Sequence, residues 1–310
     1  MRFKRAFKGN NILAESRQVA HDGDRYGRQT AVMMSCFGDE SADETKQRVF
    51  AVAGVIGGDR QWENLETKWV TRIGNTPFHA KDCESDQGDY RGIDHKQNQD
   101  LYKDLTQLLA TSGMGGWGFA IDLQAQKRVF PDAPDISYYK CFVEVLDAML
   151  ICAAYNKETV KFTFDMRSEG EYNTGLLYRM FLDLPPLRKH LFSEISFACH
   201  KKNIRVQIGD LLARETMKSL DNIIGPVKRN PRKSWLALAE TGNFHVKAVG
   251  EEYFGDLKRQ MPTLLEKTGI KFDDYRQWLQ DTKHQDNTTN YFLYVEYVIK
   301  RGKGKNEQGI

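Results

Sequence analysis

The feature that most constrains the fold is an alternation of short apolar runs with longer segments of helical periodicity between residues 30 and 220. The runs at 30–38 and 48–56 are compact and separated by a polar stretch, which is typical of two antiparallel strands joined by a loop. The segments 61–73 and 97–110 carry their large apolar side chains at helical spacing. Two strands followed by alternating helices and strands predict an α/β fold.

The alternation continues to about residue 220 and then stops. Further strands are predicted at 117–123, 159–164 and 194–198, and further helices at 137–155, at 172–182 and from 205 to about 220. The stretch 81–92 is polar and predicts an irregular connection, whereas beyond residue 221 only helices are predicted, at 253–267 and 272–280. We therefore expect a basic N-terminal extension at 1–29, an α/β domain at 30–221 and a mainly helical C-terminal appendage at 222–310.

Composition excludes several classes of protein. With 310 residues, of which 40% are hydrophobic and 11% aromatic, the chain can bury a sizeable core and is too apolar to be disordered. The longest apolar stretches, such as 148–154, fall far short of the ~20 residues that cross a bilayer, so no membrane partner is expected. The five cysteines are odd in number, and residues 1–8 lack the apolar run of a secretory signal. We expect reduced thiols in a cytoplasmic protein.

Positive charge is concentrated in patches, because the net charge of the whole chain is only +3. Residues 1–30 hold seven basic and three acidic side chains, and two further basic patches lie at 228–233 and 300–305. Such patches are usually solvated surfaces, and the alternative is contact with phosphate groups.

Three aspartates lie at positions that suggest a functional or structural role for their carboxylates. Asp39 follows the first apolar run and Asp165 follows the strand predicted at 159–164, although an acid at a strand end can also be a turn or a cap. Asp210 lies within the apolar part of a predicted helix, where a carboxylate is costly unless it is paired or bound to metal, and it shares a helical face with Gln207 and Arg214. Carboxylates gathered from distant segments repel each other, and Mg²⁺ or Mn²⁺ is a physical reason to gather them. Paired ions of this kind cleave phosphodiesters.

Five motifs in order resemble those of the domain-of-unknown-function 3800 family, which is placed in the ribonuclease-H-like superfamily. They are Gly38-Asp39-Glu40-Ser41, the apolar run 50–56, Phe78-His79-Ala80, Phe164-Asp165 and Gln207-Ile208-Gly209-Asp210-Leu211-Leu212-Ala213. The resemblance covers about residues 30 to 220. Two positions depart from the family pattern, Ala42 where glycine is common and Gly209 where alanine is usual, and both replace one small residue by another.

The resemblance implies a ribonuclease-H-like mixed sheet flanked by helices and a divalent-metal-dependent nuclease. Asp39, Asp165 and Asp210 would then be the acidic cluster that holds Mg²⁺ or Mn²⁺, with Glu40 as a further ligand and His79 as an accessory catalytic residue. The substrate would be DNA or RNA, and the setting that the family suggests is bacterial defence.

Other interpretations of the same residues stay open. The fold could be a non-catalytic ribonuclease-H-like module that binds nucleic acid or a protein partner, with the acids as a structural hydrogen-bond cluster, or it could act on a small nucleotide. His79 could orient a phosphate or act as a general base, and it could equally bond a loop at the surface. A homo-oligomer is left open by the apolar stretches 235–238 and 291–297.

Two further patterns resemble sites but lack the required context. Residues 113–118 match G-x-G-x-x-G, yet they follow a predicted helix and precede a strand, so we interpret them as a helix end and a turn. His79, Cys83 and His95 lack the spacing of zinc ligands.

Overall fold

The computed structural model describes residues 33–131, 137–156, 158–166 and 191–268. The predicted extension at 1–29, the predicted helices at 172–182 and 272–280, and the basic patches at 1–30 and 300–305 therefore lie outside the described residues.

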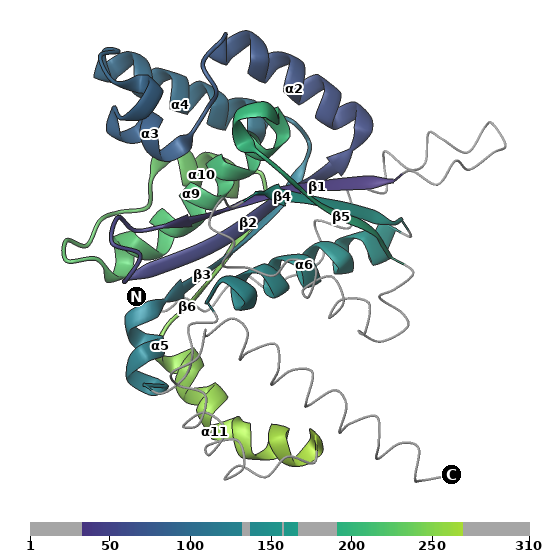
Figure 1. The fold of residues 1–310 in the computed structure, drawn as a ribbon, viewed down its shortest axis with the longest axis vertical. Helices are drawn as coiled ribbons and strands as arrows, with labels where there is room; N and C mark the ends of the chain where they lie inside the picture. Colours follow the sequence, from purple (N-terminus) through teal and green to yellow (C-terminus); the bar gives the residue numbers. More distant parts are fainter. Residues whose placement is uncertain (1–32, 132–136, 157, 167–190, 269–310) are drawn as a thin grey trace, which may run out of the picture.

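The chain forms a mixed sheet in the order β5-β4-β1-β2-β3-β6 (Figure 1). The strands are β1 (Met34–Ala42), β2 (Val49–Gly58), β3 (Gly115–Asp122), β4 (Val160–Asp165), β5 (Phe192–Ala198) and β6 (Phe244–Val249). Strand β2 pairs antiparallel with both β1 and β3, which confirms the predicted hairpin. Strand β4 is parallel to β1 and β5, and β6 is parallel to β3. The predicted α/β class is therefore correct.

Helices cover both faces of the sheet. They are α2 (Asp59–Ile73), α3 (Ala80–Ser85), α4 (His95–Ala110), α5 (Leu123–Val129), α6 (Ser137–Asn156), α9 (Ile204–Ile224), α10 (Lys233–Ala239) and α11 (Glu251–Thr268), with 3₁₀ turns η1 (Gly88–Tyr90) and η2 (His200–Lys202). Figure 1 shows α2, α4, α9 and α10 on one side of the sheet and α5, α6 and α11 on the other. The stretch 81–92, expected to be irregular, forms α3 and η1.

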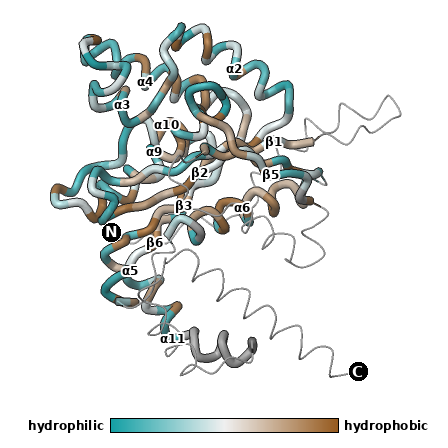
Figure 2. Tube along the Cα trace, viewed as in Figure 1, coloured by the Kyte–Doolittle hydropathy of each residue, from teal (hydrophilic) through white to brown (hydrophobic). Residues whose placement is uncertain are grey.

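Each face of the sheet has its own core, because successive strand residues point to opposite faces. Phe37 and Val55 belong to a cluster with Trp62 of α2 and the buried side of α9. Cys36 belongs to a second cluster with the apolar residues of α6. Figure 2 shows that α6 and β2 are mostly hydrophobic, whereas α2 is mostly hydrophilic.

Helix α9 is the element that lies closest to the centre of the sheet. The Asn203 side chain caps it by accepting a hydrogen bond from the backbone N–H of Val206 at 3.2 Å. A Cβ atom at Gly209 would lie 2.8 Å from the Cα atom of Gly38, so the backbones of α9 and β1 are in direct contact. This close approach sets the position of every side chain on that face of α9.

The part of the chain beyond residue 221 contributes to the sheet as well as to the helical layers. Among its described residues, α11 lies where a helix was expected, whereas α10 was not predicted as a separate helix and β6 extends the sheet beside β3. Phe244 of β6 and Leu238 of α10 are buried in the same core as α9. The strand is a six-residue edge strand that alternates apolar and polar residues, a weak signal that follows directly on a helix.

The glycine-rich stretch at 113–118, predicted to be a helix end and a turn, is a turn that leads into β3, which already begins at Gly115. Gly113 has a φ of 71° in the turn between α4 and β3, and the remaining glycines lie in β3. A Cβ atom at Gly118 would lie 2.0 Å from Oγ1 of Thr216, so this glycine lets α9 pack directly on the sheet.

Two findings concern the state of the cysteines and the search for helices that could cross a membrane. All five cysteines lie in described segments and are free thiols. Among the described helices, none is both long and apolar enough to cross a membrane.

Candidate active site

Asp39 and Asp165 lie side by side on neighbouring parallel strands. The register pairs Gly38 of β1 with Phe164 of β4, and the two aspartates are the next residues along each strand. Asp165 ends β4 as predicted, whereas β1 continues to Ala42, so Asp39 lies within β1 just beyond its pairing with β4. The side-chain alternation directs both carboxylates to the face of the sheet that α9 covers.

Asp210 reaches the same place from α9. It follows Gly209, the residue whose backbone contacts Gly38, and its side chain is 4% exposed. Its Oδ2 atom accepts a hydrogen bond of 2.7 Å from the backbone N–H of Ala80, the first residue of α3. Three predicted site residues from β1, β4 and α9 are therefore brought together.

The gathered carboxylates make ionisation of Asp39 unfavourable. The pKa of Asp39 is raised well above its usual value, first by burial and then by the negative charges of Glu40, Asp210 and Asp165. A hydrogen bond of 2.7 Å from the backbone N–H of Glu40 to Oδ1 acts in the opposite direction. The pKa of Asp210 is also raised by burial, against the opposing effect of His79 and other partners. The site therefore places several carboxylates close together in a buried position.

Glu40 affects the ionisation of the cluster through its negative charge. It follows Asp39 within β1, so alternation directs its side chain to the opposite face of the strand. It is the largest charge effect on the pKa of Asp39, after burial. The structure therefore places Glu40 beside Asp39 but on the other face from α9.

His79 lies at the edge of the cluster, where α3 begins. Its Nδ1 atom is 2.9 Å from Oδ2 of Asp82, and its side chain is 38% exposed. Its ring stacks on that of His200, with the ring centroids 5.6 Å apart and an angle of 24° between the planes. Its charge favours the ionised form of Asp210, so the predicted accessory residue belongs to this site.

His200 is a site residue that the sequence analysis did not identify. Its backbone N–H donates a hydrogen bond of 2.8 Å to Oδ1 of Asp165, and its Nδ1 atom lies 3.3 Å from Oδ2. The hydrogen bond to Asp165 raises the pKa of His200. The available signal was positional: His200 follows the strand predicted at 194–198 as Asp165 follows the one at 159–164.

Gln207 fastens the histidine-bearing segments to α9. Its side chain is fully buried, its Oε1 atom accepts a hydrogen bond of 3.1 Å from the N–H of Phe78, and its Nε2 atom donates one of 2.8 Å to the carbonyl of His200. Arg214, two turns further along α9, binds Glu84 at 2.6 Å. The predicted common face of Gln207, Asp210 and Arg214 is confirmed, because all three bind the segment 78–84.

No protein-family model matches the chain, and no curated protein matches it.

The carboxylate oxygens of the cluster are the type of ligand that a divalent cation prefers. Within the described residues, Oδ2 of Asp39 and Oδ1 of Asp210 accept no hydrogen bond, and carboxylate oxygens are the ligands that Mg²⁺ and Mn²⁺ prefer. No group of three or more His, Cys, Asp or Glu side chains in the described segments is arranged to hold a metal ion. Binding of one ion by all three aspartates would therefore require side-chain movement.

Proposed function

We propose that this protein is a divalent-metal-dependent nuclease with a ribonuclease-H-like fold that hydrolyses phosphodiester bonds in DNA or RNA. The observation that carries the proposal is the convergence of three aspartates from segments far apart in the sequence, with the pKa of Asp39 raised by burial and by the charges of Glu40, Asp210 and Asp165. Gathering buried like charges is costly unless a cation or a substrate uses them. The mixed six-stranded sheet flanked by helices is compatible with the proposed fold.

In this mechanism Asp39, Asp165 and Asp210 would hold Mg²⁺ or Mn²⁺. When bound, such ions activate a water molecule and stabilise the leaving oxygen. The protein orients the carboxylates: His200 holds Asp165 and the N–H of Ala80 holds Asp210. Glu40 adds negative charge next to Asp39 and thereby strengthens cation binding.

His79 is the more exposed of the two histidines in the site, with 38% of its side chain exposed against 27% for His200. It lies close enough to Asp210 to affect its pKa, and its imidazole is partly exposed. We assign to it contact with the scissile phosphate or transfer of a proton to the leaving oxygen.

A non-catalytic binding module is the second candidate, and it has an observation in its favour. Asp165 and Asp210 each accept a hydrogen bond from the protein, which is what a purely structural cluster would show. In that case the three aspartates would stabilise the fold through their hydrogen bonds. The protein would then bind nucleic acid or another protein without cutting it.

The test is cleavage of labelled single- and double-stranded DNA and RNA with Mg²⁺, with Mn²⁺ and with EDTA. We expect metal-dependent cutting by the wild type and a loss of at least about 100-fold in Asp39→Asn and in Asp165→Asn, because one ligand of the ion is lost. Asp100→Asn, on the exposed side of α4, is the matched control and should cut normally. If no substrate is cut and calorimetry detects no metal binding, the binding module is the better account.

A further inference from the structure

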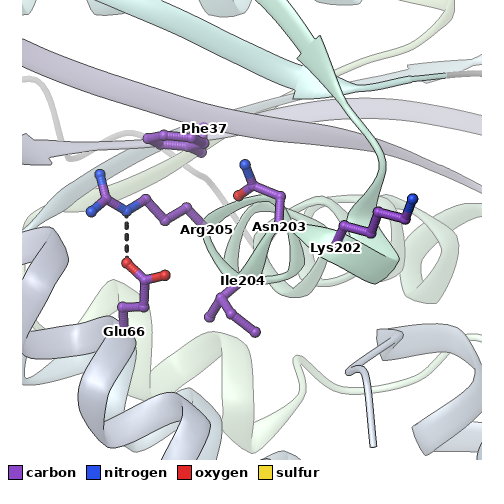
Figure 3. A pocket seen from close by; sticks show the side chains of 6 residues that line it. All are labelled: Phe37, Glu66, Lys202, Asn203, Ile204 and Arg205. Carbon is purple, nitrogen blue, oxygen red and sulfur yellow. Dashed lines mark hydrogen bonds and ion pairs between the residues drawn. The ribbon is translucent and has the colours of Figure 1, made fainter.

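An open pocket of about 280 Å³ lies beside the carboxylate cluster (Figure 3). It is lined by Phe37, Glu66, Lys202, Asn203, Ile204 and Arg205. Phe37 precedes Asp39 by two residues on the same face of β1, a distance of about 7 Å along the strand. Lys202 follows His200 by two residues, at the end of η2. The pocket therefore adjoins the site at both of these elements.

Arg205 is held in a fixed orientation at the wall of this pocket. Its Nε atom donates a hydrogen bond of 2.9 Å to Oε2 of Glu66, as Figure 3 shows. Its guanidinium carbon lies 5.5 Å from the ring centre of Phe37 and 5.8 Å from that of Trp62. Neither Nη atom makes a hydrogen bond or an ion pair within the described residues. A guanidinium fixed in this way presents two parallel donors, the geometry that suits a phosphate group.

The charge around the pocket is positive on the side nearest to the site. Lys201 and Lys202 are both exposed, and neither forms an ion pair in the described part of the chain. Glu66 is the one acid among the six lining residues, and its charge is directed to Arg205. An anion entering the pocket would thus meet an unpaired ammonium group and the free side of a guanidinium.

Arg232, in the basic patch at 228–233, has a different role from Lys202 and Arg205. Arg232, within the patch 228–233, lies 3.1 Å from Oε1 of Glu84 and 3.4 Å from Oε1 of the buried Glu215. Arg214 binds the same Glu84. These cations are neutralised within the fold, so they are poorly placed to contact phosphate.

We propose that the pocket is a subsite for one backbone phosphate of a nucleic acid strand, next to the phosphate that lies over the carboxylate cluster. This inference rests on the proposed function and adds a direction to it: the strand runs from the aspartates past η2, towards Lys202 and Arg205. It requires a substrate longer than a mononucleotide, because the subsite and the cluster must be occupied by different phosphates.

The experiment measures binding rather than cleavage. A fluorescein-labelled strand of about 12 nucleotides, as DNA and as RNA, is titrated with full-length protein in EDTA and followed by fluorescence anisotropy at several salt concentrations. The variants are Lys202→Ala, Arg205→Lys, which keeps the charge but loses the two-pronged donor, and Glu66→Gln, which can still accept a hydrogen bond from Arg205. Lys103→Ala, on the exposed side of α4, is the control.

We expect Lys202→Ala and Arg205→Lys to weaken binding about three- to tenfold, and Lys103→Ala to leave it unchanged. For Lys202→Ala the slope of log affinity against log salt should become less steep by about 0.7, the value for one phosphate contact with a single strand. Glu66→Gln should tighten binding about two- to threefold, because it removes a negative charge from the wall of the pocket. A purely structural role for Arg205 and Glu66 would not produce this opposite sign.

Equal binding of the strand by all the variants would overturn the subsite, whether or not the wild type cuts nucleic acid. Adenosine monophosphate that competes as well as a strand of equal phosphate concentration would also overturn it, since one phosphate would then suffice. Binding that depends on Lys202 and Arg205 in a protein that fails to cut would support the subsite while excluding the nuclease.

Discussion

Asp39 is the residue at which stability and the proposed activity are expected to oppose each other. Burial and three neighbouring negative charges raise its pKa in the folded protein above the usual 3.8. The folded state therefore binds this proton more tightly than the unfolded state does. The free energy of unfolding should consequently decrease as the pH rises above the usual range of an aspartate, until the pH exceeds the raised pKa of the folded state.

The substitution Asp39→Asn removes this charge and nearly preserves the shape of the side chain. We expect the free energy of unfolding at pH 7 to rise by about 1–2 kcal/mol, and this gain to disappear as the pH falls towards 4. Urea unfolding followed by tryptophan fluorescence at several pH values measures both effects. Asp100→Asn is the control and should differ from wild type by only a few tenths of a kcal/mol at any pH. A variant at Asp39 that is less stable than wild type at pH 7 would contradict the electrostatic account.

Gln207 is predicted to be essential for the architecture of the site, although it is not a proposed ligand. The substitution Gln207→Met keeps the volume but leaves the N–H of Phe78 without a partner and removes one of the two hydrogen bonds to the carbonyl of His200, which still accepts one from the N–H of Asn203. An unsatisfied buried group costs about 1–3 kcal/mol, so we expect a loss of about 1–3 kcal/mol in the free energy of unfolding. The control is Gln107→Met at an exposed position of α4, where the same replacement of glutamine by methionine is made. Stability equal to that of wild type would show that these hydrogen bonds are readily replaced.

The sequence predicted the three aspartates but could not predict their partners. Asp39 and Asp165 are recognisable because each follows an apolar run, and Asp210 because it interrupts an apolar helical segment. His200 is separated from Asp165 by 35 residues, and their contact depends on the parallel pairing of β4 with β5. Local patterns contain no information on which strands pair, so a residue whose role depends on that pairing is missed.

At the scale of elements, the contact between α9 and β1 positions the cluster. Gly209 precedes Asp210 and lies against Gly38, which precedes Asp39. A side chain at Gly209 would separate the two backbones, whereas one at Gly38 would meet the ring of Phe164 on the other face of β1. The distance between the two carboxylates is therefore controlled by a contact that contains no charged group.

The substitution Gly209→Ala tests this contact. The added methyl group would lie 2.8 Å from the Cα atom of Gly38 and 3.1 Å from two further backbone atoms of that residue, so α9 or β1 must move. We expect a loss of about 1–3 kcal/mol in the free energy of unfolding, together with weaker binding of Mn²⁺ measured by calorimetry. Gly255→Ala in α11 is the matched control: its nearest atom would be Nη1 of Arg259 at 3.6 Å, and alanine should stabilise this helix by about 0.5–1 kcal/mol. The same sign at both positions would exclude the backbone contact as the cause.

Elements with a long periodic pattern were predicted well, whereas the short elements α3 and β6 were not. The helices α2, α4, α6 and α9 were each expected within a few residues of their bounds, because each has a continuous apolar face. Helix α3 and strand β6 contain only six residues each, and tertiary contacts rather than local pattern determine their structure. Helix α3 in particular forms where His79 and Ala80 meet α9.

At the scale of the whole molecule, buried polar contacts connect the elements beyond residue 221 to the rest of the fold. The Tyr102 hydroxyl of α4 donates a hydrogen bond of 2.7 Å to Oε1 of Glu215 in α9. Arg232, directly before α10, lies against the same carboxylate and 5.1 Å from the ring centre of Tyr102. Helix α10 and strand β6 thus share their surroundings with the elements that position the site.

This arrangement predicts that residues 222–249 unfold together with the sheet rather than as a separate appendage. Leu238 of α10 is fully buried in the core beside α9, so Leu238→Ala should lower the free energy of unfolding by about 2–5 kcal/mol in one cooperative transition. Leu236, two residues earlier on the same helix, is 43% exposed, and Leu236→Ala should change stability by less than about 0.5 kcal/mol. Urea unfolding monitored both by circular dichroism and by tryptophan fluorescence distinguishes the two cases. Two transitions, with only the weaker one shifted by Leu238→Ala, would show that α10 and β6 fold independently of the strands that hold Asp39 and Asp165.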